Sequence, residues 1–365
     1  MINFYPKNLK TNLCKNNKIQ SNKICRNREA KGDVFVKKSN NVSHIIQVSK
    51  PTEDLAYIKN ICKDMKIAGI TPAKLQSVIG PKEFKDIIAK KTNNRTFYVT
   101  GERPKDKEGI PDSNKLENVK MKVFGASLHT HSTNSDGKLT VEEILNQAAE
   151  YGDEYEKVSH CPFVIGITDH NTVDGCKEAV KIIASDPEKY KNIRVVLGAE
   201  ISTKESELNG YKFKKPEKYH LLTLCVNPFD ITLNDFLADL QKDSGTPMRV
   251  KTISLQEAYD NLSNQQQCYF ALAHPAYPDI THRIKDDKNP YDTTRELIKH
   301  FKDIAGDRGL YSEAYYSSYY GNLATDSQLY DTIVKACDDY GLYKAGGIDT
   351  HGEYIFYNGQ NVKHK

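Results

Sequence analysis

The sequence predicts an α/β protein whose core is a sheet of seven strands. From Lys122 onward, short apolar runs alternate with stretches that carry the 3.6-residue period of amphipathic helices. No internal repeat of about 20 to 50 residues is visible, which argues against a solenoid. Because strands that alternate with helices form parallel sheets, we expect a parallel sheet that is either open or closed into a barrel.

The expected strands and helices follow one another in a regular order. The strands cover residues 123–129, 163–168, 194–200, 219–226, 269–274, 309–316 and 343–349. The helices cover residues 140–151, 174–184, 233–241, 292–303 and 326–340. The first helix has the clearest start, because Thr140 and Glu143 form a capping-box pattern ahead of its apolar residues.

The region before the first strand has a different composition, and we expect three units in the chain. Residues 1–50 are rich in Lys, Asn and Ser and predict a basic, poorly ordered tail. Residues 51–120 predict a small helical extension and a linker, in which Thr52 caps one helix and Pro72 opens a second. Residues 121–365 hold all seven strands and predict a barrel unit with the active site.

Charge and cysteine content narrow the function classes. The net charge of +4 combines a basic region over residues 1–120 with an acidic remainder, since residues 1–50 alone hold 11 basic and 2 acidic residues. The eight cysteines form no CxxC pair, which disfavours a zinc ribbon and a disulfide scaffold. The start of the chain lacks the apolar core of a secretory signal, and no apolar run reaches the roughly 18 residues of a membrane helix. A cytoplasmic protein without membrane association is expected.

Histidines and acids gather at the carboxyl ends of the expected strands. His129 and His131 lie two residues apart, so at a strand end their imidazoles point to the same side, and Asp349 and His351 repeat this spacing. Because carboxyl ends of parallel strands converge at one edge, these groups are expected to form one zinc, manganese or iron site. The full set is His129, His131, His170, His220, His274, His351, Asp136, Asp169, Glu200 and Asp349.

Six short motifs in this order resemble a known family. They are LHTHS at 128–132, SDG at 135–137, ITDHNT at 167–172, GAE at 198–200, AHP at 273–275 and GIDTHG at 347–352. Together they are similar to the ordered motifs of the PHP (polymerase and histidinol phosphatase) superfamily, over about 230 residues from 121 to 352. The resemblance implies a distorted seven-stranded (β/α)7 barrel, here preceded by the small helical extension, with a trinuclear metal site.

The resemblance also implies which residues bind the ions. The first ion would be held by His129, His131, Glu200 and Asp349. Glu200 would bridge to a second ion, which His220 and His274 complete. The third ion would be held by Asp136, His170 and His351. The family often has His at the position of Asp136. An Asp there puts the metal affinity and metal preference of this third site in question. Asp169 is expected to orient a ligand from behind. Two to three divalent ions are expected, of Zn, Mn or Fe, with Mg as a further candidate.

Such a site favours hydrolysis of a phosphoester. Neighbouring divalent ions neutralise the charge of a phosphate, and a metal-bound hydroxide would attack phosphorus. The expected substrate is a phosphomonoester of a small metabolite or nucleotide. Arg283 is either a phosphate-binding group or a solvated loop arginine, and Glu313 either contacts substrate or pairs internally.

Two other functions remain as alternative hypotheses. One is a nuclease or exonuclease that acts on nucleic acid or nucleoside bisphosphates, with the basic N-terminal region attracting the polyanion. The other is a nucleic-acid-binding protein that works through residues 1–120. The chain contains no GxxxxGK[ST], GxGxxG or GxSxG motif, which excludes the commonest nucleotide-binding and serine-hydrolase signatures.

Overall fold

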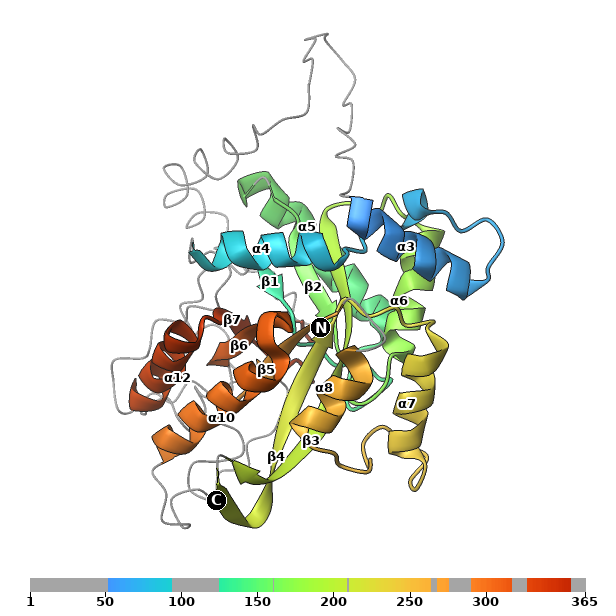
Figure 1. Cartoon of the computed structure of the whole chain (residues 1–365). Coiled ribbons are helices and arrows are strands. Elements are labelled where there is room, and N and C mark those ends of the chain that lie inside the picture. The colour runs from blue at the N-terminus through green and yellow to red at the C-terminus, as the bar shows by residue number, and fades with distance from the viewer. Residues whose placement is uncertain are drawn as a thin grey trace.

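The protein has a mixed α/β fold built on one curled sheet of seven strands in the order β1 to β7 (Figure 1). The computed structural model describes residues 52–93, 125–159, 161–208, 210–263, 268–275, 290–316 and 327–355. The strands are β1 (Ala126–Ser127), β2 (Phe163–Ile167), β3 (Ile193–Leu208), β4 (Tyr211–Leu224), β5 (Tyr269–Ala273), β6 (Gly309–Tyr316) and β7 (Tyr343–Gly347). All seven expected strands are therefore confirmed.

The expectation of an all-parallel sheet is wrong at the centre. Strands β1 to β3 pair in parallel, and so do β5 to β7, but β4 runs antiparallel to both β3 and β5. Both β3 and β4 extend beyond the predicted ranges and form a long hairpin, which turns at Gly210 with φ of +81°. So short a connection cannot carry a crossover, because parallel strands need a dozen or more linking residues.

Helices cover the outer face of the curled sheet (Figure 1). They are α5 (Val141–Ser159), α6 (Asp174–Ser185), α7 (Ile231–Gln241), α8 (Leu255–Ser263), α10 (Pro290–Ala305) and α12 (Ser327–Tyr340). The five predicted helices are confirmed, whereas α8 was missed. It has nine residues and buries only Leu255, Ala258 and Leu262, so its period is too short to stand out in the sequence.

The segment before β1 packs directly on the sheet. It forms α3 (Thr52–Met65), a single 3-10 turn (Pro72–Leu75) where a helix starting at Pro72 was expected, and α4 (Pro81–Asn93). The buried Asp54 accepts hydrogen bonds from the backbone N–H groups of Lys82 and Glu83, so α3 caps the start of α4. The division of the chain at residues 50 and 120 stays a prediction.

An inner apolar cluster fills one end of the curled sheet. Phe84 and Ile88 of α4 pack there against alternate residues of the strands, including Val164 and Val196. These strand residues lie toward the amino ends of β2 and β3, so α4 occupies the end of the sheet opposite the carboxyl ends. The carboxyl ends are left for the polar residues of the site.

The two edges of the sheet meet just beyond β1 and β7. Thr130 and Thr350 form a parallel bridge, in which the N–H of His131 donates to Thr350 O at 2.9 Å and the N–H of Thr350 donates to His129 O at 3.1 Å. Curling of the sheet therefore places the first and last histidine motifs side by side.

Some sequence expectations fall on other parts of the chain. The basic tail over 1–50, residues 94–124 with the expected linker, and Arg283 lie outside the described residues. Within the described ranges, no helix combines the length and apolar character needed to cross a bilayer.

Candidate metal centre

The structure brings together nine side chains at the carboxyl end of the curled sheet. Most follow the strand ends directly, because the chain turns there from apolar sheet to polar loop. All are buried except Asp136 and His220, whose side chains are 34% and 21% exposed. These nine are the predicted ligands His129, His131, Asp136, His170, Glu200, His220, His274, Asp349 and His351.

The first cluster is compact enough to hold one ion. It contains one atom each of His129, His131, Glu200 and Asp349, all within 4.8 Å of one another. The two imidazole Nε2 atoms lie 3.0 Å apart, and each lies 3.0 to 3.3 Å from Glu200 Oε2 and Asp349 Oδ1. Four ligands about 2.0 to 2.1 Å from one ion are separated by about 3.3 Å, so these spacings fit one ion at the centre.

Glu200 presents its two oxygens to different histidines. Its Oε1 lies 2.8 Å from His220 Nδ1 and 3.0 Å from His274 Nε2. Its Oε2 faces the first cluster and also lies 3.1 Å from His170 Nδ1. One carboxylate thus touches two groups of imidazoles, which is the arrangement of a bridging ligand. His170, Glu200 and His220 also form a compact group with ligand atoms within 4.8 Å, so His170 approaches the second position as well as the third.

The third cluster joins Asp136, His170 and His351 to His131. Asp136 Oδ1 lies 3.2 Å from His351 Nε2 and 3.8 Å from His170 Nε2. His131 Nδ1 lies 3.7 Å from the same oxygen. This cluster is looser and more exposed than the first, and its only carboxylate is Asp136.

The donor set of these clusters fits divalent ions. Glu200 Oε2, His170 Nδ1 and His351 Nε2 are buried, and none of them makes a hydrogen bond of acceptable geometry. Buried polar atoms without hydrogen bonds are costly, and they persist where another group satisfies them. Imidazole and carboxylate ligands in this number are typical of zinc, manganese and iron sites.

Burial and nearby charges keep two carboxylates ionised and one imidazole neutral, which are the forms that bind a metal ion. Burial raises the pKa of Glu200, but His129, His220 and His170 outweigh it and hold that pKa well below the usual range. Asp349 behaves in the same way beside His129 and His351. Burial lowers the pKa of His170 to about 3, so this imidazole is neutral at pH 7.

His131 differs from His170, because its pKa in the metal-free site is raised, as are the pKa values of His129 and His274. Burial alone would lower the pKa of His131, but Asp349 and Glu200 raise it to about 10. Only one hydrogen fits between the Nε2 atoms of His131 and His129, which lie 3.0 Å apart. The pair therefore holds at least one proton at the point where the first ion would bind.

Metal binding is accordingly expected to release at least one proton from the first cluster at pH 7 to 8. The apparent affinity should rise at least about tenfold per pH unit from pH 7 to 9, because a bound proton competes with the ion while the pH is below the pKa of His131, which is about 10. Calorimetric titration with Zn²⁺ in buffers of different ionisation enthalpy measures the released proton. A proton count of zero at pH 7 would contradict the protonated His131.

Asp169 orients the loop that carries Asp136. Its Oδ1 accepts hydrogen bonds from Ser132 N at 2.6 Å, Ser132 Oγ at 3.0 Å and Ser135 Oγ at 2.8 Å. Close packing leaves no room for a larger side chain nearby, since a Cβ on Gly175 would lie 2.1 Å from Asp169 Oδ2. Asp169 thus holds the loop over 132–135, as a group behind the ligands rather than among them.

Glu313 pairs internally, which was one of the two alternatives left open by the sequence. It is fully buried on β6, with Oε1 2.9 Å from His129 Nδ1. Its Oε2 accepts the backbone N–H of His274 at 2.8 Å. His274 has φ of +23°, an uncommon conformation for a residue other than glycine, and this hydrogen bond helps to hold it. Glu313 therefore supports one ligand of each of two clusters.

The sequence did not single out the supporting roles of Ser132 and Asn171. Ser132 contacts Asp169 as described, and Asn171 ties the loop after α7 to the site, donating from Nδ2 to Ser202 Oγ at 3.0 Å and to Pro247 O at 2.9 Å. Asn171 has φ of +50°, which asparagine tolerates better than most residues. Both residues lie inside the quoted motifs, and that position was the only signal available.

The chain matches a known domain family. The model of the PHP domain family matches residues 127–316. A phosphoribosyl 1,2-cyclic phosphate 1,2-diphosphodiesterase of Eggerthella lenta is 33% identical over 99 residues, which cover 27% of this chain and 30% of that protein. The chain thus matches less than a third of the length of this curated relative.

Two solved structures are also similar at 15% sequence identity. One is a Bifidobacterium adolescentis protein assigned as a metal-dependent phosphoesterase, with a TM-score of 0.43 over 64% of this chain and 88% of that one. The other is the lesion-specific endonuclease PfuEndoQ of Pyrococcus furiosus, with a TM-score of 0.37 over 66% of this chain and 52% of that one. Because the family model covers more than half of the sequence and includes most of the ligand motifs, the chain belongs to the PHP family of metal-dependent hydrolases.

Proposed function

We propose that this protein hydrolyses a phosphoester, most simply a phosphomonoester of a small metabolite or nucleotide, at a site of three divalent ions. The observation that carries the proposal is the position of Glu200, whose two oxygens contact separate sets of histidines 2.8 to 3.2 Å away. The (β/α)7 barrel geometry belongs to the same proposal, and the bridge between Thr130 and Thr350 supports it.

The ligand assignment extends the clusters seen in the structure. We assign the first ion to His129, His131, Glu200 and Asp349. The second is assigned to Glu200, His220 and His274, with His170 close enough to contribute. The third is assigned to Asp136, His170 and His351. When bound, such ions would supply positive charge for the phosphate oxygens and a deprotonated water for attack on phosphorus.

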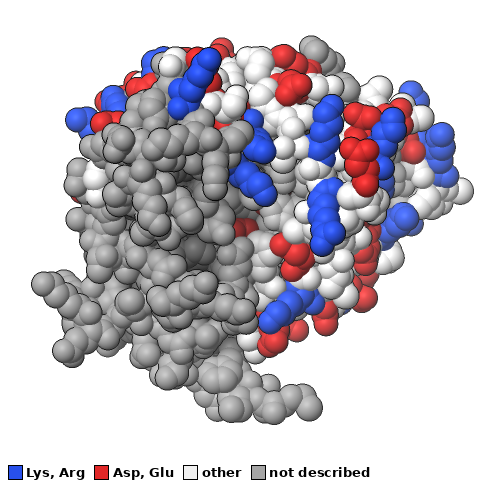
Figure 2. Space-filling view, turned by 90° about the horizontal axis from the view of Figure 1, so that it is seen from below, with Lys and Arg blue, Asp and Glu red and all other residues white. Residues whose placement is uncertain are grey.

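The exposed members of the site indicate where the substrate enters. Asp136 and His220 are the only ligands with substantially exposed side chains, whereas the other imidazoles and carboxylates are 10% exposed or less. The substrate is therefore expected to approach between the loop after β1 and the part of β4 that carries His220. Figure 2 views the molecule from below Figure 1, the side toward which the β3–β4 hairpin extends, and basic side chains lie among acidic ones over the described part of that face.

Metal reconstitution tests the proposed function. Full-length protein stripped with a chelator and reloaded with Mn²⁺, Zn²⁺, Fe²⁺ or Mg²⁺ is expected to bind two to three ions and to release phosphate from at least one of a panel of phosphorylated metabolites. His131→Ala should lose at least one ion and lower the rate about 10³-fold, since it removes a ligand of the first ion. His300→Ala is the matched control, because this α10 histidine lies outside the clusters. Absence of both bound metal and hydrolysis would overturn the proposal.

A further inference from the structure

The β3–β4 hairpin continues past the metal centre and keeps one face turned toward it. Glu200 on β3 and His220 on β4 both point into the centre. Ser202 is paired with His220, and the next pair on the same face is Lys204 with Lys218. Because side chains alternate between the two faces of a strand, the two lysines share the face of Glu200 and His220.

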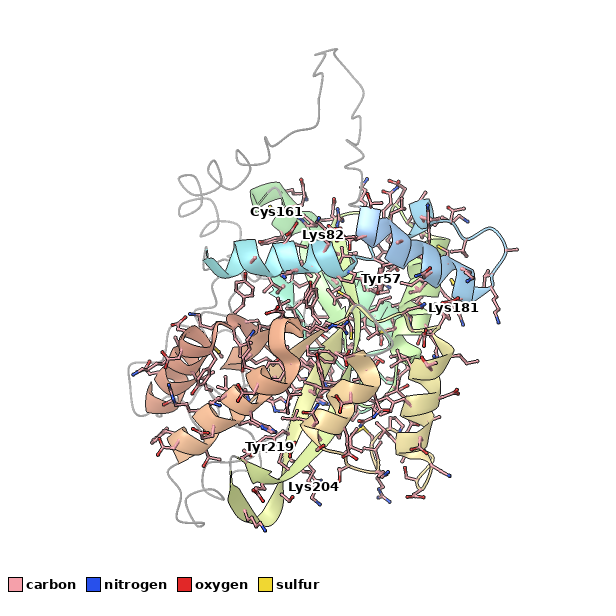
Figure 3. The ribbon with its side chains drawn as sticks, in the orientation of Figure 1. Tyr57, Lys82, Cys161, Lys181, Lys204 and Tyr219 are labelled. Carbon is pink, nitrogen blue, oxygen red and sulfur yellow. The ribbon has the colours of Figure 1, made fainter. Side chains whose placement is uncertain are left out.

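Burial along the hairpin confirms this alternation. Tyr219 and Thr203 are buried on the opposite face, where Thr203 Oγ1 donates to Tyr219 O at 2.7 Å. Glu205 is also buried on that face and accepts the N–H of Leu255 at the start of α8. Lys204 is partly exposed and Lys218 is exposed. Figure 3 labels Lys204 and Tyr219 on this hairpin.

The two lysines have no acidic partner among the side chains that the structure describes. Like charges directly opposite in an antiparallel pair destabilise the sheet. Among the described residues, neither Lys204 nor Lys218 has a carboxylate within 4.0 Å, although other lysines of the chain do, such as Lys177 with Asp174. Two lysines that lie opposite each other in the register, on one face and without such a partner, offer positive charge that an anion would stabilise.

We propose that Lys204 and Lys218 bind a second phosphate group of the substrate, so that the enzyme acts on small bisphosphorylated molecules. This inference rests on the proposed phosphoesterase function and names its substrate class. Lys218 lies two residues from His220, about 7 Å along the strand, and Lys204 lies four residues from Glu200, about 14 Å. A second phosphate roughly 7 to 14 Å from the one at the metal centre fits this spacing, as in a molecule phosphorylated at both ends.

Two probes that differ only in the second phosphate test the proposal. They are 1,6-hexanediol bisphosphate and hexyl phosphate, assayed by phosphate release with the metal-loaded full-length protein. The double variant K204Q/K218Q is expected to lower kcat/KM for the bisphosphate about 10- to 100-fold, mainly through KM, and this loss should exceed that for hexyl phosphate at least tenfold. A non-hydrolysable hexane-1,6-bisphosphonate should lose affinity to the same extent in a calorimetric titration.

Lys212→Gln is the matched control. This exposed lysine lies on the same hairpin but is paired with Glu207 near the turn, away from the centre. It should leave both substrates unaffected. Equal losses for the two probes in K204Q/K218Q, or no loss for either, would overturn the proposal. A selective loss of oligonucleotide hydrolysis would assign the lysines to nucleic acid and would overturn it as well. Wild-type protein that hydrolyses no phosphoester would instead refute the proposed function itself.

Discussion

Glu200→Gln is expected to lower kcat/KM at least about 10³-fold and to reduce the bound metal by at least one ion. The substitution keeps the shape of the side chain but removes its charge and turns one oxygen into an NH₂ group, which cannot bind a metal. Either orientation of the amide loses one of the two oxygens that face separate histidines, at 2.8 Å from His220 and 3.1 Å from His129. A 10³-fold lower rate corresponds to a loss of about 4 kcal/mol in the stabilisation of the transition state by the metal charge.

Elemental analysis and phosphate-release assays on the same preparations measure both effects. Glu205→Gln is the matched control, because Glu205 is a buried glutamate of the same strand that caps α8 and contacts no ligand histidine at hydrogen-bond distance. It should cost about 1 kcal/mol of stability and leave the metal content unchanged. A Glu200→Gln protein with its full metal content and wild-type activity would exclude the bridging role.

The order of the strands and the ligand residues could be predicted from the sequence because both depend on local patterns. Apolar runs mark buried strands, and the polar residues that end them converge wherever the strands are adjacent. His129 and His131 illustrate this. Because they lie two residues apart at a strand end, both rings are on the same side, and their Nε2 atoms are 3.0 Å apart. No long-range information was needed to expect this pair.

The direction of β4 and the partner of Glu313 required long-range information. Residues 201–218 are mostly polar and contain no apolar run, so their sequence predicts neither the extended hairpin nor the antiparallel direction of β4. Glu313 and His129 are separated by 184 residues, and only the curling of the sheet brings them to 2.9 Å. A buried acid in an apolar strand indicates a buried partner, but it does not say which one.

Glu313→Gln is expected to weaken binding of the first ion about 10- to 100-fold, with a similar loss of kcat/KM. The carboxylate accepts two hydrogen bonds, from His129 Nδ1 at 2.9 Å and from the His274 N–H at 2.8 Å. A carboxylate only accepts, so it keeps the proton on Nδ1 and leaves His129 Nε2 free to bind an ion. Glutamine has a single acceptor oxygen for these two donors. If its NH₂ group faces His129, the ring proton moves to Nε2 and competes with the ion, and if it faces His274, the ligand backbone loses its hydrogen bond.

Competition with a chromophoric chelator separates this role from direct contact with substrate. An internal support changes metal affinity before any substrate is added, whereas a substrate contact would raise KM and leave metal affinity unchanged. Glu353→Gln, at an exposed position near the site, is the control and should alter neither quantity. Excess metal should restore much of the activity of Glu313→Gln. The substitution weakens metal binding by disturbing the orientation of a ligand, and a higher metal concentration refills the site by mass action. Unchanged metal affinity together with a raised KM would show that Glu313 acts on the substrate after all.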